Sequence, residues 1–170
     1  MPDSQRWQPW WLEAENQSTV ATELLQLGRF SSAVFHALMA RELAVKALRL
    51  APATYGDLRQ ATYGELKTYT YGQLGDGLDL RKGHTPAADA PWLRGYPVAA
   101  VSTRIAAVEA ELGLVAGALY EACRYPDVWP GTAQTPHLRI QEHHAREIAA
   151  AVDVLLLACR VRFNSGTGGG

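Results

Sequence analysis

The sequence has few of the residues that build disulfide-stapled or membrane-spanning proteins. It holds 2 cysteines in 170 residues, too few for a disulfide framework. Cys123 and Cys159 lie in apolar segments with helical spacing, which predicts buried thiols in a reducing cytoplasm. No apolar run approaches the roughly 18 residues of a membrane span. The longest candidate, residues 148–159, is interrupted by Asp153, so we expect no membrane helix.

An excess of either charge is also missing. The chain has 16 Lys+Arg and 17 Asp+Glu, for a net charge of -1. A protein that coats nucleic acid nonspecifically needs a strongly positive surface, so that class is excluded, although a local basic patch is not. The first residues carry no hydrophobic stretch of the secretory type, so we expect a cytoplasmic protein. The 48% of hydrophobic residues is enough for a buried core.

Helical spacing of apolar residues dominates the sequence, and strand alternation is nearly absent. The pattern predicts long helices at about residues 11–27, 31–50, 98–119, and from 137 or 139 to 162. Gly28 is expected to end the first helix, and Ser31 or Ser32 to cap the second. The apolar residues of 98–119 alternate spacings of three and four, as in the seam of a left-handed bundle.

Residues 52–97 have a different character. A Thr-Tyr-Gly-x-Leu unit occurs at 54–58, 62–66 and 70–74. Each unit resembles a capping box, which predicts one or two short helices here. The repeat has two readings, a duplicated local segment or a tyrosine-lined ligand surface. The Gly-, Asp- and Pro-rich stretch 75–97 predicts a long surface loop.

These patterns predict an all-α fold. We expect an up-and-down antiparallel bundle of four long helices, with short extra helices and a long loop inserted between the second and third. The domain would span residues 1–163 with the insertion at 52–97, and residues 164–170 would form a flexible tail.

Two short motifs add a resemblance to a known family. A Phe-His-Ala stretch at 35–37 is followed by Glu42 and Lys46, and Arg-Tyr-Pro-Asp stands at 124–127. In order and spacing these resemble the HEPN domain family (higher eukaryotes and prokaryotes nucleotide-binding domain), in its Arg-Tyr-Pro-Asp branch. The resemblance covers about residues 11–50 and 98–160. Where that branch commonly has a Gln-Gln pair, this chain has Leu38-Met39, which favours extra core or dimer contact.

The resemblance implies a nucleotide- or RNA-associated binding module that acts as a homodimer and needs no cofactor. Arg124 could contact a phosphate while Tyr125 stacks on a base, or the loop could simply satisfy groups at a helix end. A buried Glu42–Lys46 pair would mark a specified interface, whereas an exposed pair would only support the helix. The candidate nucleotide-binding residues are Arg124, Tyr125, Asp127, His36, Glu42 and Lys46.

A ribonuclease is the second hypothesis. Catalytic members of the family resemble one another in an Arg-x(4–6)-His motif and cleave RNA without a metal, and Arg139 and His144 fit it. Arg would hold the scissile phosphate and His would move the 2′-hydroxyl proton. On one regular helix the two side chains would point about 140° apart, so convergence needs a helix that begins between them or a second protomer. His144 could equally be a packing residue.

That enzyme would be the toxin half of a pair whose partner has a minimal nucleotidyltransferase fold, as the family implies. The sequence favours a non-catalytic module over the enzyme, and a purely structural assembly protein is the third hypothesis. Histidines at 137, 143 and 144 suggest a metal, but His143 and Glu147 are the single pair with ligand spacing. We therefore expect no metal site. No Gly-rich phosphate loop of the usual spacing and no Ser-His-Asp arrangement is present.

Overall fold

The computed structural model describes residues 7–51, 73–74, 78–79, 93, 95–131 and 135–165. In these residues the chain forms a helical bundle, so the all-helical prediction is confirmed in its coarse form. The long helices are α1 (Gln8–Gln26), α2 (Phe30–Leu50), α4 (Val98–Glu111) and α7 (Glu142–Ser165). Shorter elements are α5 (Leu119–Ala122), the 3-10 turn η3 (Pro126–Val128) and α6 (Pro136–Arg139). None of the helices described has the length and hydrophobicity to cross a bilayer.

The predicted insertion and tail are described only in part. Two two-residue strands, β1 (Gln73–Leu74) and β2 (Leu78–Asp79), pair antiparallel. The third Thr-Tyr-Gly-x-Leu unit therefore ends in a strand rather than a helix, and the first two units lie outside the described residues. At the other end of the chain, α7 continues to Ser165. The predicted tail boundary at residue 164 was two residues too early.

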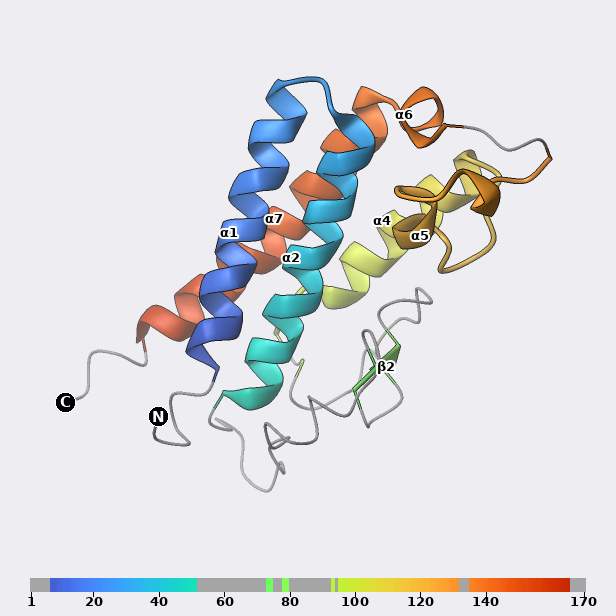
Figure 1. The fold of residues 1–170 in the computed structure, drawn as a ribbon. Helices are drawn as coiled ribbons and strands as arrows, with labels where there is room; N and C mark the ends of the chain where they lie inside the picture. Colours follow the sequence, from blue (N-terminus) through green and yellow to red (C-terminus); the bar gives the residue numbers. More distant parts are fainter. Residues whose placement is uncertain are drawn as a thin grey trace.

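Helix α2 occupies the middle of the bundle. It packs side by side with α1 and against α7, which crosses behind both, and α4 packs against α7 (Figure 1). Alanines at 33, 37, 40, 44 and 47 are all buried, so the neighbouring helices can approach α2 closely. A helix that is apolar on most of its circumference is expected at such a central position.

The turn from α1 to α2 is built by Gly28. Its φ is 70°, and the N–H groups of Gly28 and Arg29 donate to the carbonyl oxygens of Leu25 and Leu24 at 3.1 and 2.8 Å. This is a Schellman motif, and it confirms Gly28 as the end of the first helix. The predicted serine cap was wrong. Arg29 is the N-cap residue without a side-chain hydrogen bond, and Ser31 lies inside the first turn.

The third helix ends earlier than its apolar pattern predicted. Gly113 has a φ of 70°, and the Leu114 N–H donates to the backbone carbonyl oxygen of Glu109 at 2.8 Å, which makes a second Schellman motif. Beyond it Val115 is 76% exposed, and Leu119 is buried as the first residue of α5. The seam predicted over 98–119 is therefore one helix only as far as Glu111.

The fourth predicted helix is two helices. α6 ends at Arg139, Ile140 is extended with a ψ of 110°, and α7 begins at Glu142. Ile140 is fully buried, so the break directs an apolar side chain into the core. Because α7 begins after Arg139, the spacing of Arg139 and His144 on a single helix no longer applies.

The two ends of the described chain lie together. The rings of Trp7 and Phe163 stack at 4.2 Å between centroids with an interplanar angle of 11°. Trp11 packs on the same phenylalanine at 5.0 Å. Cys123 and Cys159 are free and buried, as predicted. Burial raises the pKa of both thiols, that of Cys159 to about 12.

Candidate functional site

Arg124 and Tyr125 stand on the turn that follows α5. Their N–H groups both donate to the Glu121 carbonyl oxygen at 2.9 Å, which closes the end of the helix. The turn is anchored by Trp129, which is buried and donates its indole N–H to the Ala122 oxygen at 3.1 Å. The chain therefore leaves α5 in a fixed direction, with both Arg124 and Tyr125 exposed.

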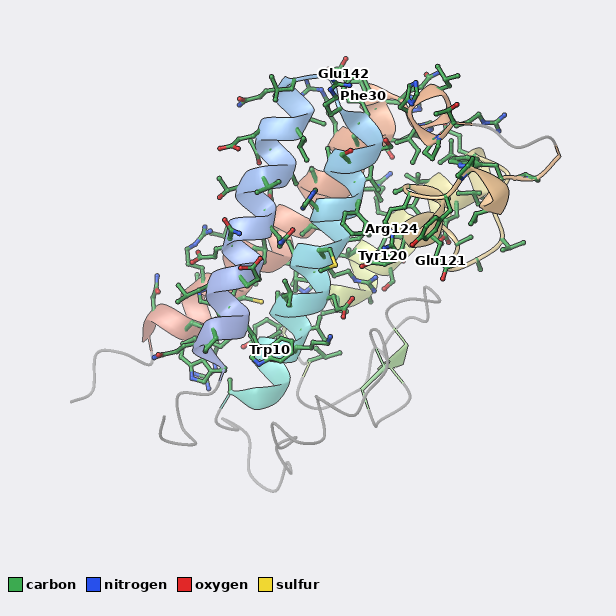
Figure 2. The ribbon with its side chains drawn as sticks, in the orientation of Figure 1. Trp10, Phe30, Tyr120, Glu121, Arg124 and Glu142 are labelled. Atoms are coloured by element: carbon green, nitrogen blue, oxygen red, sulfur yellow. The ribbon has the colours of Figure 1, made fainter. Side chains whose placement is uncertain are left out.

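Three aromatic rings surround the Arg124 side chain. Its guanidinium carbon lies 5.0, 4.9 and 4.8 Å from the ring centroids of Phe35, Tyr120 and Tyr125. Figure 2 shows Tyr120 and Arg124 beside each other at α5. These distances are within the range of cation–π attraction, about 0.5–1 kcal/mol for an exposed pair. We call Arg124, Phe35, Tyr120 and Tyr125 the Arg124 cluster.

The rings of the Arg124 cluster are themselves held in place. Phe35 of α2 and Tyr120 of α5 lie 5.1 Å apart between centroids. The Tyr120 hydroxyl donates to Met39 Sδ at 2.8 Å. Met39 belongs to the Leu38-Met39 pair that departs from the family pattern, and here it supports an aromatic residue of the cluster. Sequence patterns did not identify Phe35, Met39 or Tyr120 as site residues, because their apolar character indicated only core.

Arg124 has no competing partner in the part of the chain that the structure describes. Its side chain makes no hydrogen bond and no ion pair there, only the ring contacts. Rings that cover the guanidinium face leave the N–H donors at its edge available. Such a planar fork fits two oxygens of a phosphate or carboxylate, and the 47% exposed Tyr125 beside it offers a ring for stacking.

Three of the other predicted binding residues, His36, Glu42 and Lys46, make structural contacts. His36 Nδ1 lies 2.5 Å from Gln17 Oε1, so His36 donates from α2 to α1. Its ring meets Phe35 edge-on at 5.3 Å, and burial lowers the pKa of His36. Asp127 lies in η3, and its side chain is outside the described residues. His36 therefore contacts the Arg124 cluster only through the ring of Phe35, and its hydrogen bond links α2 with α1.

Glu42 and Lys46 form a buried pair. Lys46 Nζ donates to Glu42 Oε1 at 2.5 Å, and the ammonium lies 5.3 Å from the Trp10 ring centroid. Helical spacing places Phe35, Glu42 and Lys46 on one face of α2, so the pair lies two to three turns from Phe35. Buried charges are normally paired, and this pair fits that expectation. Burial leaves neither side chain open to a ligand at Arg124.

A further buried cation, Arg41, connects α2 with α4. Its Nη2 donates to Ser102 Oγ at 2.7 Å, while its Nε has no hydrogen-bond partner. Burial lowers the pKa of Arg41 to about 10, and the carboxylates of Glu42 and Glu109 oppose that shift. This arrangement fixes the helices relative to one another and was not predicted.

Arg139 and His144 both contact the C-terminal end of α4. Arg139 Nη2 donates to the Leu112 oxygen at 3.3 Å, and its guanidinium lies 5.4 Å from the Trp129 ring centroid. His144 Nε2 lies 3.1 Å from Glu111 Oε1, and His143 Nε2 lies 2.8 Å from the same oxygen. The two side chains therefore contact neighbouring residues, Arg139 at Leu112 and His144 at Glu111.

Their contacts in this arrangement are those of a helix end. His144 is 3% exposed, and its Nδ1 accepts the Gln141 N–H at 3.1 Å, as in a capping box. Cations are favourable at a helix C-terminus, where Arg139 satisfies a carbonyl that the helix leaves free. The hydrogen bond from His143 is the main cause that lowers the pKa of Glu111.

The oxygens and nitrogens of Glu111, His143 and His144 resemble a metal-ligand set, since one ligand atom from each lies within 4.8 Å of the others. A backbone N–H is always a donor, so the Nδ1 of His144 is unprotonated and its Nε2 carries the proton. A histidine that ligates a metal normally donates its other ring N–H to a partner, whereas Nδ1 of His144 accepts the Gln141 N–H, so this contact differs from that of a metal ligand. In the pair with metal-ligand spacing, each residue has another partner: His143 Nε2 lies 2.8 Å from Glu111 Oε1, and Glu147 Oε2 lies 3.4 Å from Arg104 Nη1.

A pocket of about 560 Å³ opens where α2 and α7 begin. It is lined by Phe30, His137, Ile140, Gln141, Glu142, His143 and Arg146. Arg146 donates to Glu142 Oε1 at 2.7 Å, so the pocket's arginine already has an acidic partner. Arg146 is therefore a weaker candidate for binding an anion than Arg124, whose side chain has no acidic partner in the described structure.

No family model matches the chain, and neither the curated proteins nor the solved structures give a match.

Proposed function

We propose that this chain is a HEPN-like, nucleotide- or RNA-associated binding module that contacts a phosphate through Arg124. The observation that carries the proposal is the guanidinium held by the rings of Phe35, Tyr120 and Tyr125, with no ion pair in the described structure. An arginine ordered before the ligand arrives loses less side-chain entropy on binding. The cluster therefore has the features of a prepared anion site.

Tyr125 supplies the second contact in this proposal. It is 47% exposed and lies beside the Arg124 guanidinium, so a base could stack on it while the phosphate meets the arginine. Stacking of a base on an aromatic side chain contributes about 1–3 kcal/mol. A nucleotide should accordingly bind more tightly than inorganic phosphate.

The proposal also includes the finer architecture. Four long helices would run up and down antiparallel with residues 52–97 inserted between the second and third, and the module would act as a homodimer in the cytoplasm. The helical hairpin of α1 and α2 and the contacts of α7 with α2 and α4 support that order. A nucleotidyltransferase-fold partner stays a hypothesis that only the family resemblance suggests.

Calorimetric titration with adenosine monophosphate, a short single-stranded RNA and inorganic phosphate tests the binding. Arg124→Gln, which removes the charge, is expected to weaken nucleotide binding by at least about tenfold, the range of a charge-assisted hydrogen bond. Tyr125→Ala should weaken the nucleotide and the RNA but not inorganic phosphate.

Arg104→Gln is the matched control, since Arg104 is an exposed arginine of α4 already paired with Glu147. It should leave all three titrations unchanged. Absence of binding to every probe by the unmodified protein, or equal losses in the Arg104 and Arg124 variants, would refute the proposal.

A further inference from the structure

Helix α7 carries an apolar ridge on the side that faces solvent. Val154, Leu157 and Val161 are 57%, 57% and 66% exposed. Their spacings of three and four residues place them on one face of the helix. Ile148, Leu155 and Cys159 on the opposite side are buried in the core. We call Val154, Leu157 and Val161 the α7 ridge.

The α7 ridge differs from the other exposed apolar side chains of the described structure. Leu12, Leu27, Val115 and Leu138 are spread over separate elements. Isolated exposed leucines and valines are ordinary on protein surfaces. A contiguous apolar row bordered by charges is typical of an interaction site.

The charges beside the ridge identify the partner. Asp153 and Arg160 are seven residues apart, so they lie on the same edge of the ridge with opposite signs. A second copy of α7 running antiparallel would bring Asp153 of each chain near Arg160 of the other. In a parallel two-fold pair the two copies of this edge would lie on opposite sides of the interface, so Asp153 and Arg160 would not meet across it. The edge is therefore complementary to itself about a two-fold axis, as an isologous interface requires.

These two side chains are held by contacts with α1. Ser18 Oγ donates to Asp153 Oδ1 at 3.1 Å, and Arg160 Nε donates to Glu15 Oε1 at 2.9 Å. Both contacts come from α1, which borders the ridge. Each leaves capacity for a partner, because the carboxylate has a second oxygen and the guanidinium has further N–H donors.

We propose that the α7 ridge is a homodimer interface, in which Val154, Leu157 and Val161 pack against the same residues of a second copy with α7 antiparallel. The inference deepens the homodimer part of the proposed function and does not depend on Arg124. The ridge faces away from α2, which packs on the other side of α7 and carries Phe35 of the Arg124 cluster. Both surfaces can be used at once.

Sedimentation velocity over a concentration series tests the interface. The unmodified protein should sediment at twice the 18.5 kDa of the chain. Leu157→Glu should raise the dimer dissociation constant on the order of a hundredfold, as for a central interface residue. Leu138→Glu is the matched control on α6, 68% exposed, and should remain dimeric. Circular dichroism verifies that both variants stay helical.

A charge exchange tests the antiparallel orientation. Asp153→Arg and Arg160→Asp should each weaken the dimer about tenfold, and the double variant should recover most of the affinity. A monomer at every concentration, an unaffected Leu157→Glu dimer, or a double variant no better than the single ones would overturn the interface. Nucleotide titration of the Leu157→Glu protein keeps the two proposals apart. All members of the Arg124 cluster belong to one chain, so a monomeric variant should still bind nucleotide. Loss of nucleotide binding in this variant would count against the Arg124 proposal and not against the interface.

Discussion

Glu109 of α4 accepts the backbone N–H of Leu119, the first residue of α5, at 3.0 Å. The carboxylate is 3% exposed and is one of the two charges that oppose deprotonation of Arg41. One side chain thus connects the end of α4, the start of α5 and the buried cation of α2. Because α5 leads directly into Arg124, this connection also fixes the candidate binding site.

We expect Glu109→Ala to lower the free energy of unfolding by about 3 kcal/mol. The variant removes one of the two negative charges that stabilise the buried Arg41 cation, and it leaves the Leu119 N–H without its hydrogen-bond acceptor. Glu109→Gln keeps an acceptor and should cost less. Urea unfolding followed by circular dichroism measures both. Glu23→Ala, an exposed position on α1, serves as the control and should change stability little. A cost for Glu109→Ala no larger than this control would contradict the connection.

The pH dependence of stability should contain a contribution from His36. Burial lowers the pKa of His36, so the fold favours the neutral ring. As the pH falls below about 6.5, the unfolded chain binds a proton that the folded chain does not, and stability decreases until the lowered pKa is passed. The unmodified protein should therefore lose more stability than His36→Gln over this range, measured by urea unfolding at several pH values.

Gln17→Leu is the matched control for that experiment. It removes the acceptor of the His36 ring but leaves the ring buried, and burial is the cause of the lowered pKa. It should lower stability at neutral pH by about 1 kcal/mol and keep the pH slope. If His36→Gln and the unmodified protein have parallel profiles, the assignment of the slope to His36 is wrong.

Neither cysteine should react in the folded protein. Burial raises the pKa of Cys123 and Cys159, and the thiolate is the reactive form. We expect a disulfide reagent at about pH 8 to label no thiol in native buffer and both of the 2 cysteines in denaturant. Rapid native labelling would show that one of these helices opens readily.

The protein should not cleave RNA in the presence of a chelator. His144 is buried with Nδ1 occupied by the Gln141 N–H, and Arg139 donates to Leu112. Arg139→Ala and His144→Ala should instead reduce stability, by about 1 and 2 kcal/mol respectively. Incubation with structured and unstructured RNA provides the measurement. Cleavage that disappears in both variants, with both still folded, would establish the ribonuclease hypothesis.

The sequence predicted the helices best where their pattern ended at a backbone signal that could be recognised. Gly28 closed α1 as expected. The start of α1 was predicted too late, at about Trp11, because Pro9 is tolerated in a first helical turn and the helix begins at Gln8. The breaks at Gly113 and Ile140 were missed. At both, apolar side chains continue at helical intervals beyond the break, and only the backbone angle shows that the helix has stopped.

The candidate site was predicted in part, for a related reason. Arg124 and Tyr125 belong to one short motif, so the sequence could identify them together. Phe35 and Tyr120 come from different helices, and only the packing of α2 against α5 brings their rings to Arg124. In the sequence both residues stand among apolar neighbours, which predicts only a place in the core. Their contacts with Arg124 form between separate helices, so no short motif contains them.

The stacking of Trp7 on Phe163 also affects how the protein is made. During synthesis the N-terminal helices emerge first, whereas Phe163 lies near the end of the described chain. The ring that covers the start of the first helix is therefore synthesised only after the other helices of the bundle. Until then the tryptophans at the beginning of α1 lack this partner, and a ribosome-bound intermediate would expose them to chaperones.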